Sequence, residues 1–231
     1  STSDRGNADV TGNYAVTYLD NLTSTISPAA LTVTAQSVSR TYDGTTTASG
    51  SGSVGLLLGA GAGETVNTAG TQAFLDKNVG TGNKVVRASG VTIKDSGNAD
   101  VTGNYNISYV DNTASTISQA ALTVTAQSVS RTYDGTTVAA LGGAATVTAL
   151  GTDTVSVAGV GTGAFADKNV GTNKPVTVSG FTLSGADSGN YNIVQPTGLT
   201  ANVSPAALTV TAQQVSRTYD GTTTASGSGS V

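Results

Sequence analysis

Residues 30–46 read ALTVTAQSVSRTYDGTT, and the same letters return at residues 121–137. They return a third time at residues 207–223 with one change, Gln214 in place of a serine. The copies start 91 and then 86 residues apart. Self-similarity at a regular period is the signature of a repeat protein. The sequence therefore indicates a tandem array of one module.

Two further markers keep the same spacing. Gly-Asn-Tyr ends at Tyr14, Tyr105 and Tyr191, and AFLDKNVGT at residues 73–81 matches AFADKNVGT at residues 164–172. The markers divide the chain into the end of a repeat (1–29), two complete repeats (30–120 and 121–206) and the start of another (207–231). This unit is longer than the 20–50 residues of a solenoid repeat, so we expect each complete repeat to have its own core.

Composition excludes several kinds of partner. Charged residues are 10% of the chain and the net charge is −4. The basic residues are dispersed singly, which excludes the positive surface expected for nucleic acid or anionic membrane. The sequence has no run of about 18 apolar residues, so we expect no membrane insertion in this segment. Cysteine is absent, which suits export across a cell envelope without disulfide formation.

The hydrophobic pattern predicts strands throughout. Leu31, Val33 and Ala35 alternate with polar residues and fall on one face of a strand. Seven or eight such short strands per unit, with no helical period, predict an all-β fold of tandem Ig-like Greek-key sandwiches that form an elongated rod. Proline in the joints, at Pro28 and Pro205, predicts short and stiff connections between units.

Several aromatic and turn residues are expected to have structural roles. Phe74 and Phe165 are predicted core anchors. Tyr105 and Tyr191 are predicted to be buried, with Tyr191 closing a tyrosine corner as in Ig-like sandwiches. Aspartate and glycine favour a turn in the repeated Tyr-Asp-Gly motif, because Asp bonds its own following backbone and Gly accepts a positive φ. The motif occupies Tyr42, Asp43 and Gly44; Tyr133, Asp134 and Gly135; and Tyr219, Asp220 and Gly221.

The sequence does not favour an enzyme. Histidine and cysteine are absent, so the commonest general base, metal ligand and thiol nucleophile are missing. Glu64 is the only glutamate, and it falls in a variable loop with no equivalent in the other copy. We expect no catalytic residue and no cofactor.

Calcium is the alternative to a metal-free chain. Asp95, Asn98, Asp100 and Asn104 place oxygen ligands within ten residues, and Asp187 marks the matching region of the next copy. The full EF-hand pattern is absent, and turns account for the same residues. We therefore expect no metal, with calcium at Asp95, Asp100 and Asp187 as the alternative.

The ordered motifs SRTYDGTT, AFxDKNVGT, GNYNI and TISPAALTVTA resemble the YDG-repeat family, which is related to the MBG bacterial Ig-like repeats. Such repeats occur in filamentous-haemagglutinin-like surface adhesins. The resemblance implies an extracellular or cell-surface location on a Gram-negative-type bacterium, with a role in adhesion or biofilm. It supplies no catalytic residues.

Two functional hypotheses arise from the repeats. The first is a structural stalk or fibre, and its partial end repeats, which leave strand edges open, predict head-to-tail self-association. The second is an adhesive module that binds glycan or protein, from a host or a matrix, along its flank. Tyr18 and Tyr109 are the candidate residues for such a flank.

Overall fold

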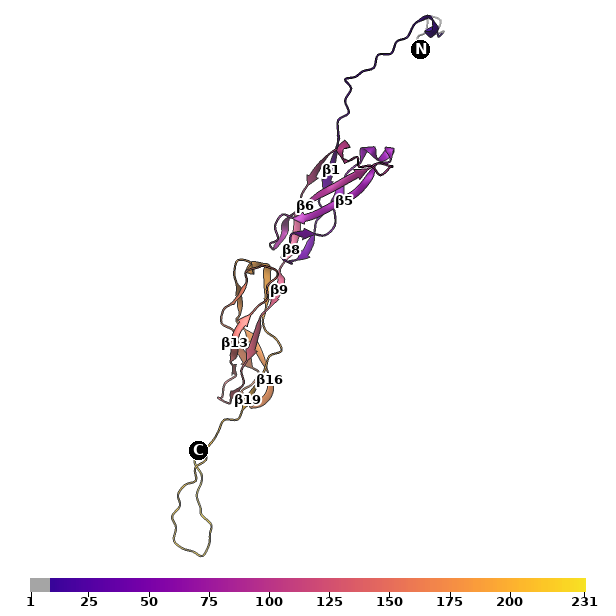
Figure 1. The fold of residues 1–231 in the computed structure, drawn as a ribbon. Helices are drawn as coiled ribbons and strands as arrows, with labels where there is room; N and C mark the ends of the chain where they lie inside the picture. Colours follow the sequence, from indigo (N-terminus) through magenta and orange to yellow (C-terminus); the bar gives the residue numbers. More distant parts are fainter. Residues whose placement is uncertain (1–8) are drawn as a thin grey trace.

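The computed structural model describes residues 9–231, and it is all-β, as predicted. Two β-rich bodies lie end to end, with extended chain at both ends of the molecule (Figure 1). We call strands β1–β8 the first unit and strands β9–β19 the second unit. Within residues 9–231 the only helices are short 3-10 turns, and none is long and apolar enough to cross a bilayer.

The first unit consists of two sheets. The smaller sheet has the order β4-β1-β7, formed by Ser53–Val54, Ala29–Thr34 and Tyr105–Val110. The larger has the order β2-β8-β6-β5-β3, formed by Ser39–Thr41, Asn112–Ser118, Gly80–Lys94, Thr65–Phe74 and Thr47–Ala48. The pairs β1–β7 and β2–β8 are parallel. The start of the unit is therefore hydrogen-bonded to its end.

The second unit repeats this pairing. Its five-stranded sheet has the order β11-β19-β16-β15-β12, formed by Arg131–Thr132, Thr200–Ser204, Gly171–Ser179, Thr162–Phe165 and Val138–Ala139. The remaining pairs are β9 (Ala120–Thr123) with β18 (Tyr191–Val194), β10 (Thr125–Ser128) with β13 (Leu141–Thr146), and β14 (Ser156–Ala158) with β17 (Thr182–Ser184). Again β9–β18 and β11–β19 are parallel, so the repeated sequence produces the same strand connections twice.

The Gly-Asn-Tyr marker has one conformation in each copy. A 3-10 turn ends at the asparagine, and the tyrosine after it is extended. The turns are η1 (Thr11–Asn13), η3 (Thr102–Asn104) and η4 (Ser188–Asn190), and a further turn, η2 (Leu58–Ala62), lies in the variable loop. In the two complete units the marker therefore places a tyrosine at the first residue of a strand, β7 or β18.

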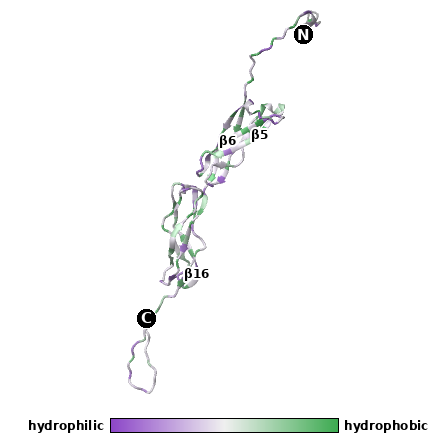
Figure 2. Cartoon of the chain, in the orientation of Figure 1, coloured by the Kyte–Doolittle hydropathy of each residue, from purple (hydrophilic) through white to green (hydrophobic). Residues whose placement is uncertain are grey.

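Burial confirms the predicted strand faces. Leu31, Val33 and Ala35 are all buried, as are the two phenylalanine anchors and the tyrosines that begin β7 and β18. Hydrophobic and hydrophilic residues are interleaved along both units (Figure 2). This alternation is what two-faced strands around a core require.

The hydrophobic interior does not follow the repeat boundary. One core cluster fills the first unit and continues into Ala120, Leu122 and Tyr191 of the second. A separate cluster around Phe165 and Val203 fills the far half of the second unit. The expectation of one separate core per repeat is therefore wrong at the joint, because the near end of the second unit is buried together with the first unit.

The partial repeats at the two ends lie outside these cores. Residues 14–25 are exposed throughout. Residues 205–231 are also exposed and form a loop in which Thr211 and Ser230 exchange backbone hydrogen bonds of 2.9 and 3.0 Å. Among the described residues, the two units between these ends hold the packed core.

Candidate functional site at the junction between the units

The Tyr-Asp-Gly motif forms the predicted turn. Asp43 Oδ1 accepts hydrogen bonds from the backbone N–H of Thr45 at 2.9 Å and from its hydroxyl at 2.8 Å. Gly44 has φ +80°, a conformation that glycine adopts without strain. The same bonds and the same positive φ recur at Asp134 with Gly135 and at Asp220 with Gly221.

An arginine ties this turn to the core. Arg40 forms an ion pair with Asp43 and lies over the Phe74 ring, 5.1 Å from its centroid. Burial raises the pKa of Asp43, but hydrogen bonds from Arg40 and Thr45 outweigh it and lower that pKa to about 2. Arg131 repeats the arrangement over Phe165 at 5.5 Å. The spacing Arg-x-x-Asp is present in every copy of the motif, but the sequence pattern did not single out the arginine.

The first tyrosine of the motif reaches across the joint. The Tyr42 hydroxyl donates to Asp153 Oδ2 at 2.6 Å, and the Tyr191 hydroxyl donates to the same oxygen at 2.7 Å. The two rings meet edge to face, with centroids 5.5 Å apart. Lys77 forms an ion pair with the other oxygen, Oδ1. One carboxylate, with its side chain 1% exposed, thus receives three donors, two of them from the other unit.

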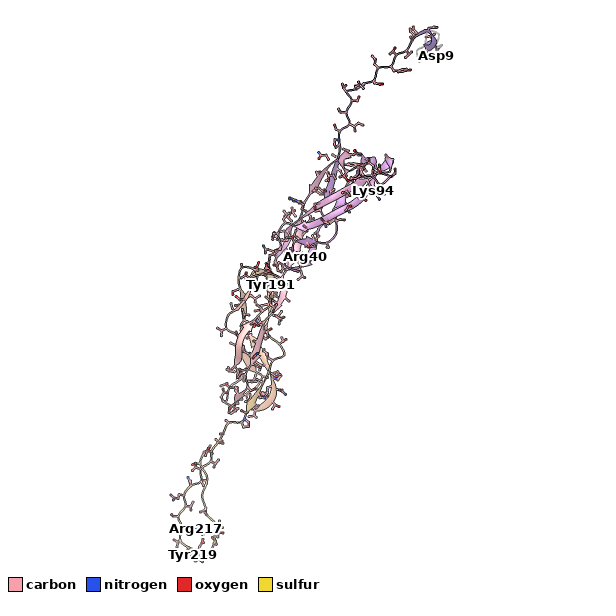
Figure 3. The ribbon with its side chains drawn as sticks, in the orientation of Figure 1. Asp9, Arg40, Lys94, Tyr191, Arg217 and Tyr219 are labelled. Atoms are coloured by element: carbon pink, nitrogen blue, oxygen red, sulfur yellow. The ribbon has the colours of Figure 1, made fainter. Side chains whose placement is uncertain are left out.

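A second set of contacts joins the Asp-Lys-Asn turn of the first unit, residues 76–78, to the second unit. Asn190 Oδ1 accepts a hydrogen bond from the backbone N–H of Val79 at 2.9 Å, and its Nδ2 donates to Asn78 Oδ1 at 3.1 Å. Lys77 also lies 3.8 Å from an Asp187 oxygen. The Asp-Lys-Asn turn of the first unit and the η4 turn of the second therefore meet at this junction through hydrogen bonds. Figure 3 places Tyr191 here, between the two units.

Apolar packing accompanies these polar contacts. A Cβ built on Gly44 would lie 3.8 Å from the Cβ of Leu150, so the motif's glycine faces the loop of the second unit.

The Leu150 N–H donates to the Tyr191 hydroxyl at 3.0 Å. This bond joins residues 41 positions apart, so Tyr191 is not the local tyrosine corner that the sequence predicted. Its hydroxyl instead holds the loop that carries Asp153.

The charges at the junction favour one protonation state. Burial raises the pKa of Asp153, but hydrogen bonds from Lys77, Tyr42 and Tyr191 outweigh it and hold that pKa below its ordinary value. The hydrogen bond to Asp153, followed by the contact with Tyr42, raises the pKa of Lys77. Burial and the bond to Asp153 raise the pKa of Tyr191 to about 12. Near neutral pH the junction therefore holds a carboxylate, an ammonium and two neutral phenols.

The three motif tyrosines differ in the part of the chain that covers them. Tyr42 is 2% exposed beneath the second unit, and Tyr133 is half-buried. Tyr219, at the far end of the C-terminal loop (Figure 3), is 93% exposed. Tyr42 and Tyr133 lie in equivalent turns of the first and the second unit, after β2 and β11. The deeper burial of Tyr42 therefore comes from the complete unit that follows it.

Glu64 accepts the tyrosine of its own unit as Asp153 does, a role that the sequence pattern did not reveal. The Tyr105 hydroxyl donates to Glu64 Oε2 at 2.5 Å and accepts from the Gly59 N–H at 2.9 Å. These contacts match those of Tyr191 with Asp153 and Leu150. The expectation that Glu64 has no equivalent is therefore wrong. Counted from the Tyr-Asp-Gly motif of each copy, the positions of the two carboxylates differ by two residues. A simple alignment of the copies therefore does not pair them.

The carboxylates considered as calcium ligands accept backbone N–H groups. Asp95 Oδ1 accepts from the Gly97 and Ala99 N–H groups, each at 2.9 Å. Asp100 Oδ1 accepts from the Thr102 N–H at 2.8 Å, and Asp187 Oδ2 from the Thr154 N–H at 2.8 Å. Over residues 9–231, His, Cys, Asp and Glu form no group of three or more able to hold a metal ion. The turn interpretation accounts for the contacts of Asp95 and Asp100, whereas Asp187 bonds a residue 33 positions away.

The two tyrosines considered for a binding flank do not form a cluster. Tyr109 is half-buried, packs against the first core and accepts a hydrogen bond from the Val91 N–H at 3.2 Å. Tyr18 is 88% exposed, on the extended N-terminal segment. They lie on different parts of the molecule.

Comparison with protein families agrees with the repeat. The YDG domain model matches the chain twice, over residues 27–114 and 118–198. The chain therefore belongs to the YDG domain family. The gap between the two matches, residues 115–117, lies within β8, just before the joint with β9. Neither the curated proteins nor the solved structures include a match to this chain.

Proposed function

We propose that this chain is a structural spacer: a stalk or fibre segment whose length comes from tandem Ig-like Greek-key units held in line by stiff junctions. The observation that carries the proposal is the buried carboxylate of Asp153, which binds Tyr42 and Lys77 of one unit and Tyr191 of the next. A flexible linker between domains needs no such network. Removing one partner of a buried charge pair is costly, which favours one relative orientation of the units.

The cellular setting belongs to the same proposal. We place the chain at the surface of a Gram-negative-type bacterium, in a secreted protein similar to filamentous haemagglutinins, where it supports adhesion or biofilm. Support comes from the YDG family, from the resemblance to MBG repeats and from a chain without cysteine. The gene around this segment tests this part. We expect a secretion signal and further copies of the repeat, and a gene without them would contradict the setting.

Stiffness of the junction is tested by distance measurements on the full chain. The chain has no cysteine, so Thr71→Cys and Thr162→Cys, at equivalent exposed positions of the two units, accept one spin label each. Pulsed electron paramagnetic resonance should give a single narrow distance distribution. Asp153→Ala should broaden it, because Tyr42 and Lys77 lose their common acceptor.

Asp167→Ala is the matched control. It removes an ion pair with Lys174 inside the second unit, away from the junction, and should leave the distribution narrow. A broad distribution in the otherwise unmodified, doubly labelled chain would overturn the stiff-spacer proposal. A screen of glycans and matrix proteins separates the spacer from an adhesive module: saturable binding by this chain would favour the adhesive alternative.

A further inference from the structure

The first unit presents, at its N-terminal end, an uncovered version of the junction. We call Leu58, Gly59, Glu64, Asn104 and Tyr105 the entry end. Its Tyr105, Glu64 and Gly59 form the same hydrogen bonds as Tyr191, Asp153 and Leu150 do at the junction. At the junction the second carboxylate oxygen binds Lys77. At the entry end Glu64 Oε1 has no hydrogen bond or ion pair with any residue of 9–231.

The surroundings of Glu64 are also open. A cavity of about 500 Å³ is lined by the entry end together with Gly103 and residues 26–29. Leu58, which lines this cavity, is 67% exposed, and Leu56 is 80% exposed. Their counterparts in the second unit, Val147 and Ala149, are partly buried against the core cluster that crosses the junction. The apolar surface that is covered at the N-terminal end of the second unit is therefore uncovered at the N-terminal end of the first.

The second unit presents the complementary surface at its C-terminal end. We call Tyr133, Lys168, Asn169 and Val170 the exit end. These residues are identical in type to Tyr42, Lys77, Asn78 and Val79, which fill the junction. Lys168 and Asn169 are exposed, and Val170 is 51% exposed. Lys168 has no ion pair within residues 9–231, and a cavity of about 400 Å³ separates Tyr133 and Val170 from Pro205 and Leu208.

We propose that the entry end is a docking site for the exit end of a second copy of this chain. Glu64 takes the place of Asp153: its free oxygen pairs with the incoming Lys168, and the carboxylate accepts the hydroxyl of the incoming Tyr133. Asn104 takes the place of Asn190 and binds the backbone of the incoming Asp-Lys-Asn turn. This inference rests on the proposed stalk or fibre function, and it names the partner and the residues that recognise it.

The contact differs from completion of the partial end repeats. The residues of those segments that the structure describes are almost all exposed, whereas the two ends proposed here lie on folded units. An end-to-end contact between different surfaces does not close on itself, so it extends as a filament. Two units joined in one chain meet at an effective concentration of about 1 mM. A contact that is weak between separate chains is therefore sufficient within an array.

Sedimentation velocity on the full chain, at concentrations up to about 1 mM, tests the proposal. The weight-average sedimentation coefficient should rise with concentration. Glu64→Lys and Lys168→Glu should each abolish the rise, because each places like charges across the contact. Mixing the two variants should restore it. In the mixture, the positive charge at position 64 of the first variant faces the negative charge at position 168 of the second. The native Lys168 of the first variant likewise faces the native Glu64 of the second.

Asp20→Lys is the control: it makes the same charge change as Glu64→Lys on the exposed N-terminal segment and should associate like the unmodified chain. Absence of association over the whole concentration range, or association that neither reversal reduces, overturns the docking proposal. So does failure of the mixture to associate when each variant alone is folded by circular dichroism. The spacer proposal is tested separately, because Asp153→Ala alters the label distances within one chain and leaves the entry and exit ends intact.

Discussion

Tyr42 and Tyr191 share one oxygen of one aspartate, and this sharing explains why a tyrosine is used twice in each repeat. The tyrosine of Tyr-Asp-Gly is a donor directed out of its own unit. The tyrosine of Gly-Asn-Tyr is a donor directed at the loop of its own unit, where it holds the carboxylate in place. Phenylalanine preserves the ring packing at either position and removes only the hydroxyl, which at Tyr191 is both a donor to Asp153 and an acceptor from Leu150.

For a single residue, we predict that Tyr191→Phe destabilises the chain by about 1–3 kcal/mol, because the buried Asp153 and the Leu150 N–H each lose a partner. Denaturant unfolding followed by circular dichroism measures this difference. Tyr219→Phe, at a position that is 93% exposed, is the control and should be neutral. Equal stabilities of the two variants would show that the Tyr191 hydroxyl contributes nothing to the fold.

Among the elements of the fold, two turns and one loop make the junction. The Tyr-Asp-Gly turn comes after β2, the Asp-Lys-Asn turn joins β5 to β6, and the loop with Asp153 joins β13 to β14. Parallel pairing of β2 with β8 places the first turn beside the end of the unit, where the next unit begins. The strand order, rather than any contact between neighbouring residues, therefore delivers these groups to a common surface.

The charges on these elements predict a pH dependence. The pKa of Asp153 is lowered on folding, so its carboxylate stabilises the junction above the ordinary value of about 4 and this contribution is lost as the pH falls below it. The pKa of Tyr191 is raised to about 12, so its neutral hydroxyl contributes below about pH 10 and is lost as the pH rises through 12.

Melting temperatures of the unmodified chain and of Asp153→Asn, measured from about pH 2 to pH 9, check the acid side. The unmodified chain should melt higher from about pH 5 to pH 9, and the two curves should converge below about pH 4. Asp20→Asn should follow the unmodified chain throughout. A difference between the unmodified chain and Asp153→Asn that stays constant down to the lowest pH would contradict the assigned role of the carboxylate.

Across the whole molecule, the hydrophobic interior is continuous over the joint. The two bodies that lie end to end in Figure 1 therefore share buried residues at their joint. This continuity supports the proposed stalk, in which each added repeat adds length. Such an array needs neither disulfides nor bound ions at its joints, provided that each junction supplies its own donors and acceptors.

We predict that folding of the chain requires no metal. The carboxylates of Asp95 and Asp100 accept backbone N–H groups within their own turns, so these turns are closed without an ion. Melting temperatures with chelator and with added calcium should agree. A decrease of many degrees in chelator, absent from an Asp95→Asn or Asp100→Asn variant, would instead assign a structural calcium ion to this loop.

The repeat, its spacing, the all-β class and the buried faces of strands such as Leu31–Ala35 are all predictable from the order of residues alone. Each of these depends on local order: an identical stretch, or alternation along a few residues, is visible without knowing what lies opposite. The same holds for the turn at Asp43 and Gly44, whose hydrogen bonds span two residues.

The binding partners of the repeated tyrosines, by contrast, required the three-dimensional arrangement. Tyr42 and Asp153 are 111 positions apart, and their contact exists because parallel pairing brings the start and end of a unit together and the next unit covers them. The equivalence of Glu64 and Asp153 was hidden for the same reason. A hydrogen bond requires a carboxylate oxygen at one point in space, and two loops of different sequence reach that point from different positions along the chain.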